Sequence, residues 1–303
     1  MFQTIPAGPH YVNVQIDRTR TLAYDSGMLE DDFCDIIKKA RTGLGLKVED
    51  VAMQARLEAS ALRELEAGRR APERAEVRAI ASALGLDGAK LASIACDAWT
   101  PAAAELVSKH TVTTIDGDIG GYAVKGYIVG DAESGEAAII DTGYNPQAML
   151  MALEREGLRL KAVCLTHGHH DHAGGLDQIL SRLPVPVYIG EEDWGMLQWK
   201  PSGSLRRFVQ DGGGVDLGKL RLRFLTTPGH TPGGVCYRAP ECVFVGDTLF
   251  AGSIGRANPA SLYPTHLQCV RQKLLTLPDD LALFPGHGPA TTVAQEKAHN
   301  PFG

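Results

Sequence analysis

The chain gathers several residues able to bind a metal ion into one short stretch. Residues 165–175 read LTHGHHDHAGG and directly follow an apolar run with the pattern of a β-strand. Imidazole and carboxylate groups are usual ligands of zinc and related divalent metals. Gly168, Gly174 and Gly175 would let the backbone approach such a centre closely, which a solvated histidine-rich loop does not require. The stretch therefore predicts a metal site at the end of a strand.

Three later segments each place one residue of ligand type beside glycine, at or just after an apolar run. They are TPGHTPG at 227–233, VGDTLF at 245–250 and FPGHGP at 284–289. Through its HxHxDH motif and the later His, Asp and His, the sequence resembles the metallo-β-lactamase superfamily from about residue 105 to residue 303. The resemblance implies a four-layer αββα sandwich and a centre of two divalent metal ions.

The resemblance also implies a role for each ligand residue. The implied ligands are His167, His169 and His230 for one metal, Asp171, His172 and His287 for the other, and Asp247 as the bridge. A water between the metals would lose its proton near neutral pH and act as the nucleophile, with Asp171 and Asp247 as the catalytic carboxylates. Zinc is the default metal, and iron and manganese are alternatives because the same ligands accept them.

Two residues and one segment are further candidates near this centre. Asp141, in IIDTG, resembles the DTG turn of the superfamily, which implies that it accepts the second N–H of a ligand histidine; a simple turn cap is the alternative. Arg256 could contact substrate or support the metal loops. Residues 191–214 could form a lid over the site or a packed surface excursion.

The later segments also resemble a particular branch of the superfamily. GDTLF at 246–250 with GSIGR at 252–256, the ending PGHGPATT and Asn300-Pro301-Phe302 are similar to the short bacterial members of the glyoxalase II-like hydrolases. The implied reaction is hydrolysis of a thioester or related ester, such as an S-acyl glutathione. Glyoxalase II proper has a helical C-terminal domain that supplies basic residues for glutathione. About sixteen residues follow His287 here, so we expect that domain to be missing.

Residues 28–97 have a different pattern, in which apolar residues recur at helical spacing in short segments separated by glycine and proline. This pattern predicts about five short helices. IKKAR at 37–41, Val51-Ala52 and LRELEAGRRAP at 62–72 resemble the helix-turn-helix domain of the Cro and phage-repressor type. In that family a recognition helix enters the major groove of DNA. The domain carries 13 acidic and 11 basic residues, a net charge of -2, which disfavours phosphate binding.

A focused basic patch would still allow DNA binding by this domain. Arg69, Arg70, Arg74 and Arg78 are the candidates for such a patch. Protein interaction or homodimer formation is the alternative role.

Between 105 and 303, β-branched runs alternate with helical segments after a connector near 97–104. This mixture predicts an α/β (α+β) arrangement of two sheets covered by helices, rather than a simple doubly wound sheet. The expected domains are a strand-like arm at 1–27, the helix-turn-helix domain at 28–97 and the hydrolase domain at 105–303. The predicted strands are 111–115, 122–129, 137–140, 161–165, 185–189, 220–225, 235–237 and 243–245, and the predicted helices are 148–156, 176–182 and 267–275.

Composition narrows the remaining functions. The chain has 303 residues, 44% of them hydrophobic, and a net charge of -6, so it has no global attraction to nucleic acid or anionic membranes. No signal-peptide or membrane-span pattern occurs, which predicts a cytoplasmic protein. The six cysteines lack CxxC spacing, and we expect free, mostly buried thiols.

Three functions are compatible with these patterns. The first is a metal-dependent thioester or ester hydrolase with an appended helical domain. The second is a transcription regulator in which the metal-hydrolase fold senses a metabolite. The third is a persulfide dioxygenase-like enzyme with a single iron, a branch that generally lacks the Pro-Gly-His-Gly form found at His287.

Overall fold

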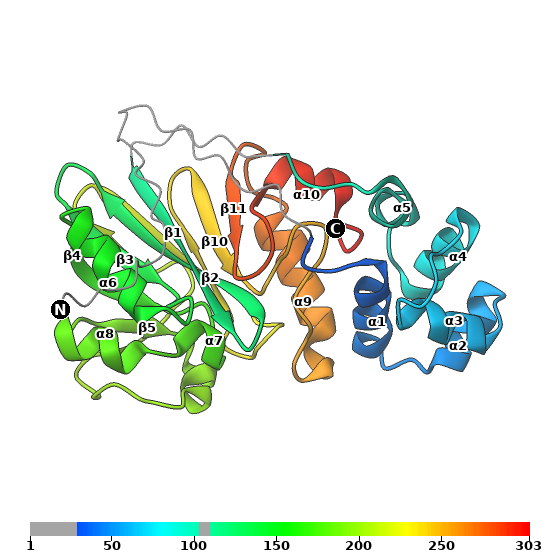
Figure 1. Ribbon diagram of the computed structural model, residues 1–303, viewed down its shortest axis with the longest axis horizontal. Helices are drawn as coiled ribbons and strands as arrows, with labels where there is room; N and C mark the ends of the chain where they lie inside the picture. The colour runs from blue at the N-terminus through cyan, green and yellow to red at the C-terminus, as the bar shows by residue number, and fades with distance from the viewer. Residues whose placement is uncertain (1–28, 103–109) are drawn as a thin grey trace, which may run out of the picture.

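The computed structural model describes residues 29–102 and 110–303. Five helices come first along the chain and form one end of an elongated molecule (Figure 1). They are α1 (Phe33–Gly43), α2 (Val48–Ala55), α3 (Ala59–Glu66), α4 (Arg74–Leu84) and α5 (Gly88–Asp97). The predicted helix-turn-helix fold is thereby confirmed. The strand-like arm expected at 1–27 and part of the connector expected at 97–104 lie outside the described residues.

The local sequence explains where these helices begin and end. The carboxylate of Asp87 accepts hydrogen bonds from the backbone N–H groups of Ala89 and Lys90 and thus caps the start of α5. Gly85 ends α4 in the left-handed conformation, with φ of 67°, which glycine adopts without steric cost. The apolar faces of the five helices meet in a buried core that includes Ile36, Val51 and Ile80.

Two mixed six-stranded sheets, together with the helices that flank them, make up residues 110–303. The first sheet has the order β1-β2-β3-β4-β5-β6 and the second the order β12-β11-β10-β9-β8-β7. The strands of the first sheet are β1 (His110–Ile119), β2 (Tyr122–Asp131), β3 (Glu136–Ile140), β4 (Arg159–Cys164), β5 (Val187–Ile189) and β6 (Arg206–Phe208). Those of the second are β7 (Gly214–Leu217), β8 (Leu220–Thr226), β9 (Val235–Arg238), β10 (Cys242–Gly246), β11 (Ala282–Pro285) and β12 (Thr291–Thr292).

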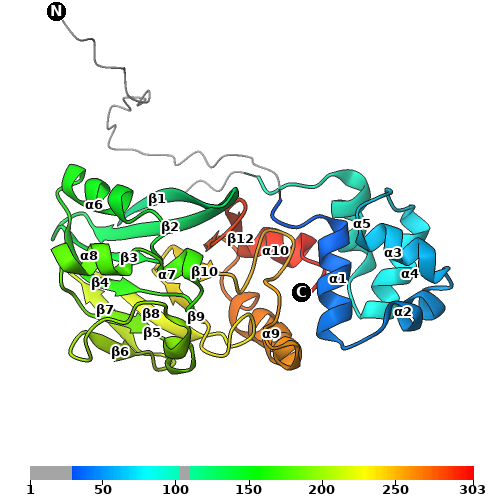
Figure 2. The same cartoon turned by 60° about the horizontal axis from the view of Figure 1, so that its bottom comes forward.

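The sheets pack face to face, and helices cover their outer faces (Figure 2). One core cluster joins the inner faces, with Val129 and Ile140 from the first sheet and Leu222 and Phe244 from the second. A second cluster lies between the first sheet and α6 (Pro146–Arg155) and α8 (Leu176–Arg182). On the far side lie α9 (Tyr263–Cys269), which continues as one π-helical turn over Val270–Leu274, and α10 (Val293–His299). The predicted four-layer αββα sandwich is therefore confirmed.

The helical domain and the outer layer of the second sheet share one hydrophobic core. Buried residues from α1–α5 and from α9, α10 and the second sheet belong to the same cluster. The backbone N–H of Asp87 donates to the carbonyl of Pro301, and the rings of Trp99 and His299 stack at 4.5 Å. This junction was not predicted, because helical periodicity shows which face is apolar but not what covers it.

Several short elements differ from the sequence-based predictions. Strands β6, β7, β11 and β12 and helix α10 were not predicted, and the helix predicted at 267–275 begins earlier, at Tyr263. All six cysteines are free thiols, four of them buried. Within the described ranges, no helix has the length and apolar character needed to cross a bilayer.

Helix α10 carries a buried carboxyl group, Glu296, that ties together the loops near the second sheet. Its oxygens accept hydrogen bonds from the Gly252 N–H, the Thr291 hydroxyl and the Asn300 side-chain amide. Burial raises the pKa of Glu296 to about 7, although these three hydrogen bonds lower it in part. Because the folded-state pKa lies above the ordinary value of 4.5, the proton on Glu296 stabilises the fold at low pH.

That stabilisation is lost as the pH rises toward 7. We expect Glu296→Gln to remove this part of the pH dependence, so that wild type loses about 3 kcal/mol relative to the variant between pH 4.5 and 8. Urea unfolding of both proteins across this range, with matched metal content, measures the difference. Parallel stability curves would contradict the shifted pKa.

Candidate metal centre

Sheet topology brings the predicted ligand loops to one edge of the sandwich. The loop with His167 follows β4, and Asp141 follows β3, which runs parallel to β4. Asp247 directly follows β10, and His287 lies two residues beyond β11, which is parallel to β10. The carboxyl ends of parallel neighbours meet at the same edge of a sheet. Side chains far apart in the sequence therefore converge there.

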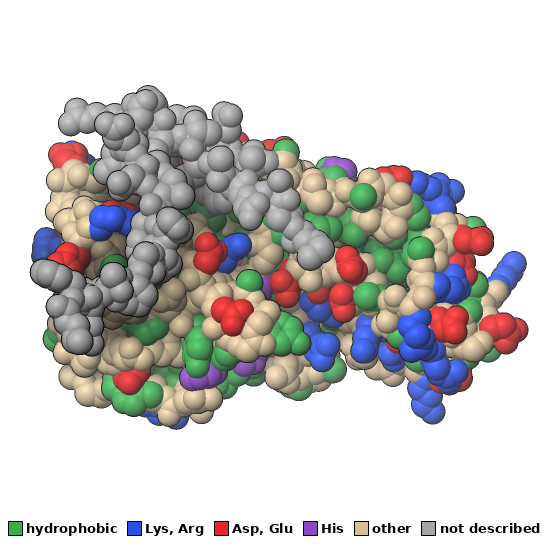
Figure 3. Space-filling model, viewed as in Figure 1, with side chains coloured by type: hydrophobic (Ala, Val, Ile, Leu, Met, Phe, Trp, Pro, Cys, Tyr) green, Lys and Arg blue, Asp and Glu red, His purple; other side chains and the backbone are tan. Residues whose placement is uncertain are grey.

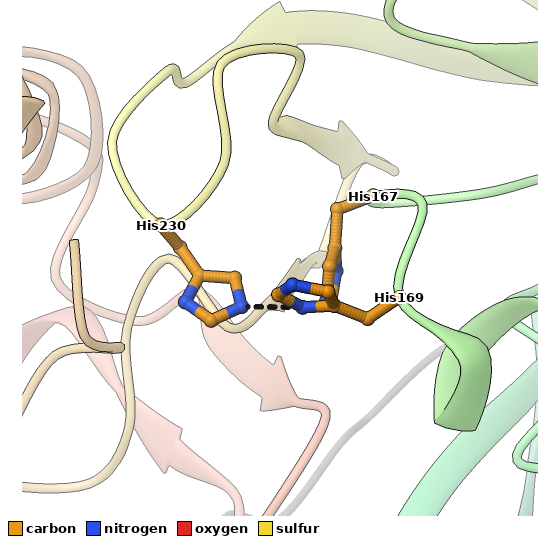
Figure 4. Close-up of side chains that lie close together, drawn as sticks. All are labelled: His167, His169 and His230. Atoms are coloured by element: carbon orange, nitrogen blue, oxygen red, sulfur yellow. Dashed lines mark hydrogen bonds between the residues drawn. The ribbon is translucent and has the colours of Figure 1, made fainter. Parts of the chain in front are cut away.

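His167, His169 and His230 form the first group at this edge. One ring nitrogen of each lies within 4.8 Å of the others. Figure 4 shows the three rings converging from two loops, with Nε2 of His230 3.0 Å from Nδ1 of His169. His167 is buried, and its Nε2 has no hydrogen-bond partner among the described residues.

Asp171, His172 and His287 form the second group. Both residues 171 and 172 belong to the short helix α7 (His170–Ala173). Oδ2 of Asp171 lies 3.3 Å from Nε2 of His287 and 3.6 Å from Nε2 of His172. The two Nε2 atoms are themselves 3.4 Å apart.

Asp247 lies between the two groups. Its Oδ2 is 3.5 Å from Nε2 of His230 and 3.7 Å from Nε2 of His287, and its Oδ1 is 3.3 Å from Nε2 of His172. Oδ1 is buried and, like Nε2 of His167, has no hydrogen-bond partner among the described residues. A buried polar atom without a partner is costly, and a cation between these donors would satisfy both. The nitrogen and oxygen donors fit divalent metals of the zinc, iron and manganese kind.

The electrostatics of the cluster also suit cation binding. Burial lowers the pKa of His167 well below its ordinary value and that of His230 to about 4, so both imidazoles are neutral at pH 7, the form that can bind a metal. Burial opposes ionisation of Asp247, yet His172 and His287 hold its pKa well below the ordinary range. Burial also acts against a charged His287, but Asp247 and Asp171 raise its pKa to about 9. A metal would replace such protons, so metal binding should release protons and weaken at low pH.

Three acceptors orient histidines of these two groups. Asp141 is buried, with φ of 52°; its Oδ2 lies 2.8 Å from Nδ1 of His172, and it also accepts the N–H and hydroxyl of Thr166. Nδ1 of His230 donates to the carbonyl of Arg256 at 2.8 Å, and Nδ1 of His287 donates to the carbonyl of Ala123 at 2.6 Å. These bonds leave each Nε2 facing the centre, as is common around protein-bound metals.

Arg256 thus supports a ligand through its backbone, while its side chain is exposed. The carbonyls of Ala123 and Arg256 were missed as His partners by sequence reasoning, because every residue offers one and no motif marks it.

Asp193 also went unrecognised in the sequence. It is fully buried, and its carboxylate accepts the N–H of Gly168, the N–H of Gly233 and the hydroxyl of Thr231. It therefore joins the loop that carries His167 to the loop that carries His230. The segment predicted as a lid or surface excursion is in part a structural clamp, and its β6 extends the first sheet. Trp199 from this segment lines a pocket with His170, beside the ligand loop.

Comparison with known proteins agrees with this geometry. The chain belongs to the metallo-β-lactamase superfamily, whose family model matches residues 119–287. A helix-turn-helix domain model matches residues 35–94. The superfamily fold binds divalent metals, which agrees with the cluster of His and Asp side chains at the edge of the sandwich.

Relatives and solved structures cover mainly one part of the chain. It is 36% identical over 183 residues to hydroxyacylglutathione hydrolase GloC of Haemophilus influenzae, covering 55% of this chain and 86% of the relative. It is 35% identical over 186 residues to the probable metallo-hydrolase YqgX of Bacillus subtilis, with 55% and 87% covered.

Among solved structures, the B3 metallo-β-lactamase BLEG-1 is similar with a TM-score of 0.57 and 29% identity, over 63% of this chain and 99% of that one. TTHA1623 in a di-iron-bound form has a TM-score of 0.54 and 32% identity, over 62% and 99%.

Proposed function

We propose that this chain is a dinuclear metal hydrolase that cleaves a thioester or a related ester. The observation that carries the proposal is the position of Asp247 between two groups of ligand-type side chains, with one buried oxygen lacking a protein partner. The similarity to hydroxyacylglutathione hydrolase GloC supports a thioester such as an S-acyl glutathione. We propose zinc as the native metal, with iron and manganese as alternatives.

In the proposed site, His167, His169 and His230 would hold one ion and Asp171, His172 and His287 the other, with Asp247 as the residue that would be shared between them. Two ions held there would supply a deprotonated water as nucleophile and would polarise the substrate carbonyl. Water oxygen is added to the acyl carbon, the carbon–sulfur bond breaks, and a carboxylate and a thiol are released.

The protein's own groups prepare the site for this reaction. Asp141 holds His172, and backbone carbonyls hold His230 and His287, so the ligands are already oriented before substrate binds. The side chain of Asp171 is 25% exposed, against 10% for Asp247. Asp171 is therefore the carboxylate better placed to pass a proton to solvent.

Metal content and thioester cleavage test this proposal together. We expect two metal equivalents per chain and thiol release from S-lactoylglutathione or from a simpler thioester by the purified protein, measured by mass spectrometry and a thiol reagent. Two metals without hydrolysis of S-lactoylglutathione or of simpler thioesters and esters would contradict the thioester and ester chemistry. One iron with persulfide-dependent oxygen uptake would favour the dioxygenase instead.

DNA binding is a second proposal, favoured by the helix-turn-helix match. The structure weakens the predicted basic patch, because Arg70 pairs with Glu76 at 2.6 Å and Arg74 pairs with Asp97. Arg63 of α3, the helix in the recognition position, pairs with Glu49. A metabolite-sensing regulator or a homodimer formed through this domain would rest on the same helices. Binding of duplex DNA, measured as a function of salt concentration, tests this second proposal. A protein that acts only as an enzyme should show no such binding.

A further inference from the structure

The helical domain reaches the edge of the metal centre through the residues that precede α1. Gly288 directly follows the ligand residue His287, and the backbone of Glu30 lies against it. A Cβ placed on Gly288 would be 3.0 Å from Cβ of Glu30 and 3.1 Å from its backbone nitrogen. The Glu30 side chain is partly exposed at this edge. Burial raises its pKa, while the nearby His287 lowers it, which agrees with its place beside the cluster.

Lys39 of α1 makes a second contact with the same loops. Its Nζ donates to the carbonyl of Ile254 at 3.0 Å and lies 5.0 Å from the ring centre of Phe250. The ring of Phe250 in turn lies 6.0 Å from that of His287. Nζ also pairs with Asp31 at 2.5 Å, and both side chains are nearly buried. Because Asp31 pairs with Lys39, Lys39 is not free to neutralise Glu30, and within 29–102 and 110–303 no ion pair involves the Glu30 carboxylate.

Packing holds the helical domain in this position. Gly43, at the end of α1, lies so close to the ring of Tyr263 in α9 that a Cβ there would overlap it. The common hydrophobic core and the Trp99–His299 stack hold the other end of the domain. Figures 1 and 2 agree that α1 lies between the metal-binding domain and α2–α4. In Figure 3, acidic side chains gather at this junction, with histidine beside them.

We propose that the helix-turn-helix domain is a fixed wall of the active site and that Glu30 selects substrates by charge. The carboxylate would favour thioesters or esters whose leaving group is cationic or neutral over those whose leaving group is anionic. This inference rests on the proposed hydrolase function and adds a substrate class to it. It gives the helical domain a part in catalysis that does not require DNA.

Three thioesters with the same acetyl group test the inference: acetylthiocholine is cationic, S-acetyl-N-acetylcysteamine is neutral and S-acetylglutathione is anionic. For Glu30→Gln, we expect kcat/KM for S-acetylglutathione relative to acetylthiocholine to rise about five- to tenfold at low ionic strength. In about 0.5 M salt the change should shrink, because exposed charges are screened. Glu30→Asp, which keeps the charge, should stay close to wild type.

Glu64→Gln is the matched control, since Glu64 is an exposed carboxylate on α3 of the same domain. The control should leave the ratio unchanged. An unchanged ratio in Glu30→Gln, with the protein folded and metal-loaded, would overturn the inference and leave the hydrolase function standing. A wild-type preference for S-acetylglutathione that is lost in Arg256→Gln and insensitive to Glu30 would also overturn it. If metal-loaded wild type cleaves none of the three thioesters, the inference is overturned, and the proposed function is then decided separately by S-lactoylglutathione and simple esters.

Discussion

Replacing Asp247 by alanine is expected to abolish hydrolysis, with kcat falling by about a thousandfold or more. This carboxylate lies within 3.7 Å of His172, His230 and His287, and it joins the two ligand groups. Its removal would leave three imidazoles without the carboxylate that would neutralise bound cations. It would also remove the proposed bridge between the two metal ions. Single-turnover kinetics and metal content per chain should both be measured, because loss of one metal and loss of chemistry are separable.

The control for this variant is Asp216→Ala, which removes an exposed carboxylate paired with Arg221 on β8. It should retain both metal equivalents and wild-type kcat. If a folded, metal-loaded Asp247→Ala protein kept full activity, the bridging role and the proposed mechanism would both be wrong.

Each predicted ligand residue follows an apolar run that ends beside glycine, and the structure brings these residues together at one edge of the sandwich. Runs such as AVCL before His167 and CVFV before Asp247 are buried on both faces in the structure, where they lie in the sandwich. A strand buried in this way reads as a continuous apolar run, and glycine marks where it ends. The sequence therefore indicates which seven side chains belong to the proposed site. It does not give the distances between their atoms in space.

The supporting residues could not be predicted in the same way. Asp193 stands in the acidic run Glu191–Asp193, which is typical of a solvated turn, and only the folded chain shows that its carboxylate is buried among three donors. The burial of Glu296 could not be predicted either, because glutamate is rarely buried and its hydrogen-bond partners are not evident from the sequence. Short strands such as β12, with two residues, carry no periodic pattern at all.

The packing of the helical domain against the metal-binding domain also could not be predicted from the sequence. The helix periods identify apolar positions such as Ile36 and Leu91, but the same stripe would suit an independent helical bundle. Its continuation into the layer of α9 and α10 depends on which surfaces meet in space. The contact of Glu30 with Gly288 joins residues more than 250 positions apart, and no local motif announces it.

Gly286→Ala is expected to damage the metal centre as severely as loss of a ligand. Gly286 immediately precedes His287, and a Cβ there would overlap Cε1 of His172 and lie 2.5 Å from Oδ1 of Asp247. The backbone cannot retreat easily, because its N–H donates to the carbonyl of Gly246 and its carbonyl accepts from the N–H of Lys125. One methyl group would therefore displace two of the proposed ligands at once. We expect loss of at least one metal equivalent and a fall in kcat of about a hundredfold or more.

The expected damage comes from the steric overlap of the added Cβ. It does not come from backbone strain, because Gly286 has no positive φ. Gly195→Ala is the matched control: Gly195 also has no positive φ, and a Cβ there meets nothing within 4 Å. That variant should keep its metal content, its kcat and its thermal midpoint. Overpacking at Gly286 should also lower the free energy of unfolding by about 1–3 kcal/mol, so unfolding must be measured beside metal content. Full metal occupancy and unchanged kcat in Gly286→Ala would show that His172 and Asp247 can move without loss of function, which contradicts a rigidly held centre.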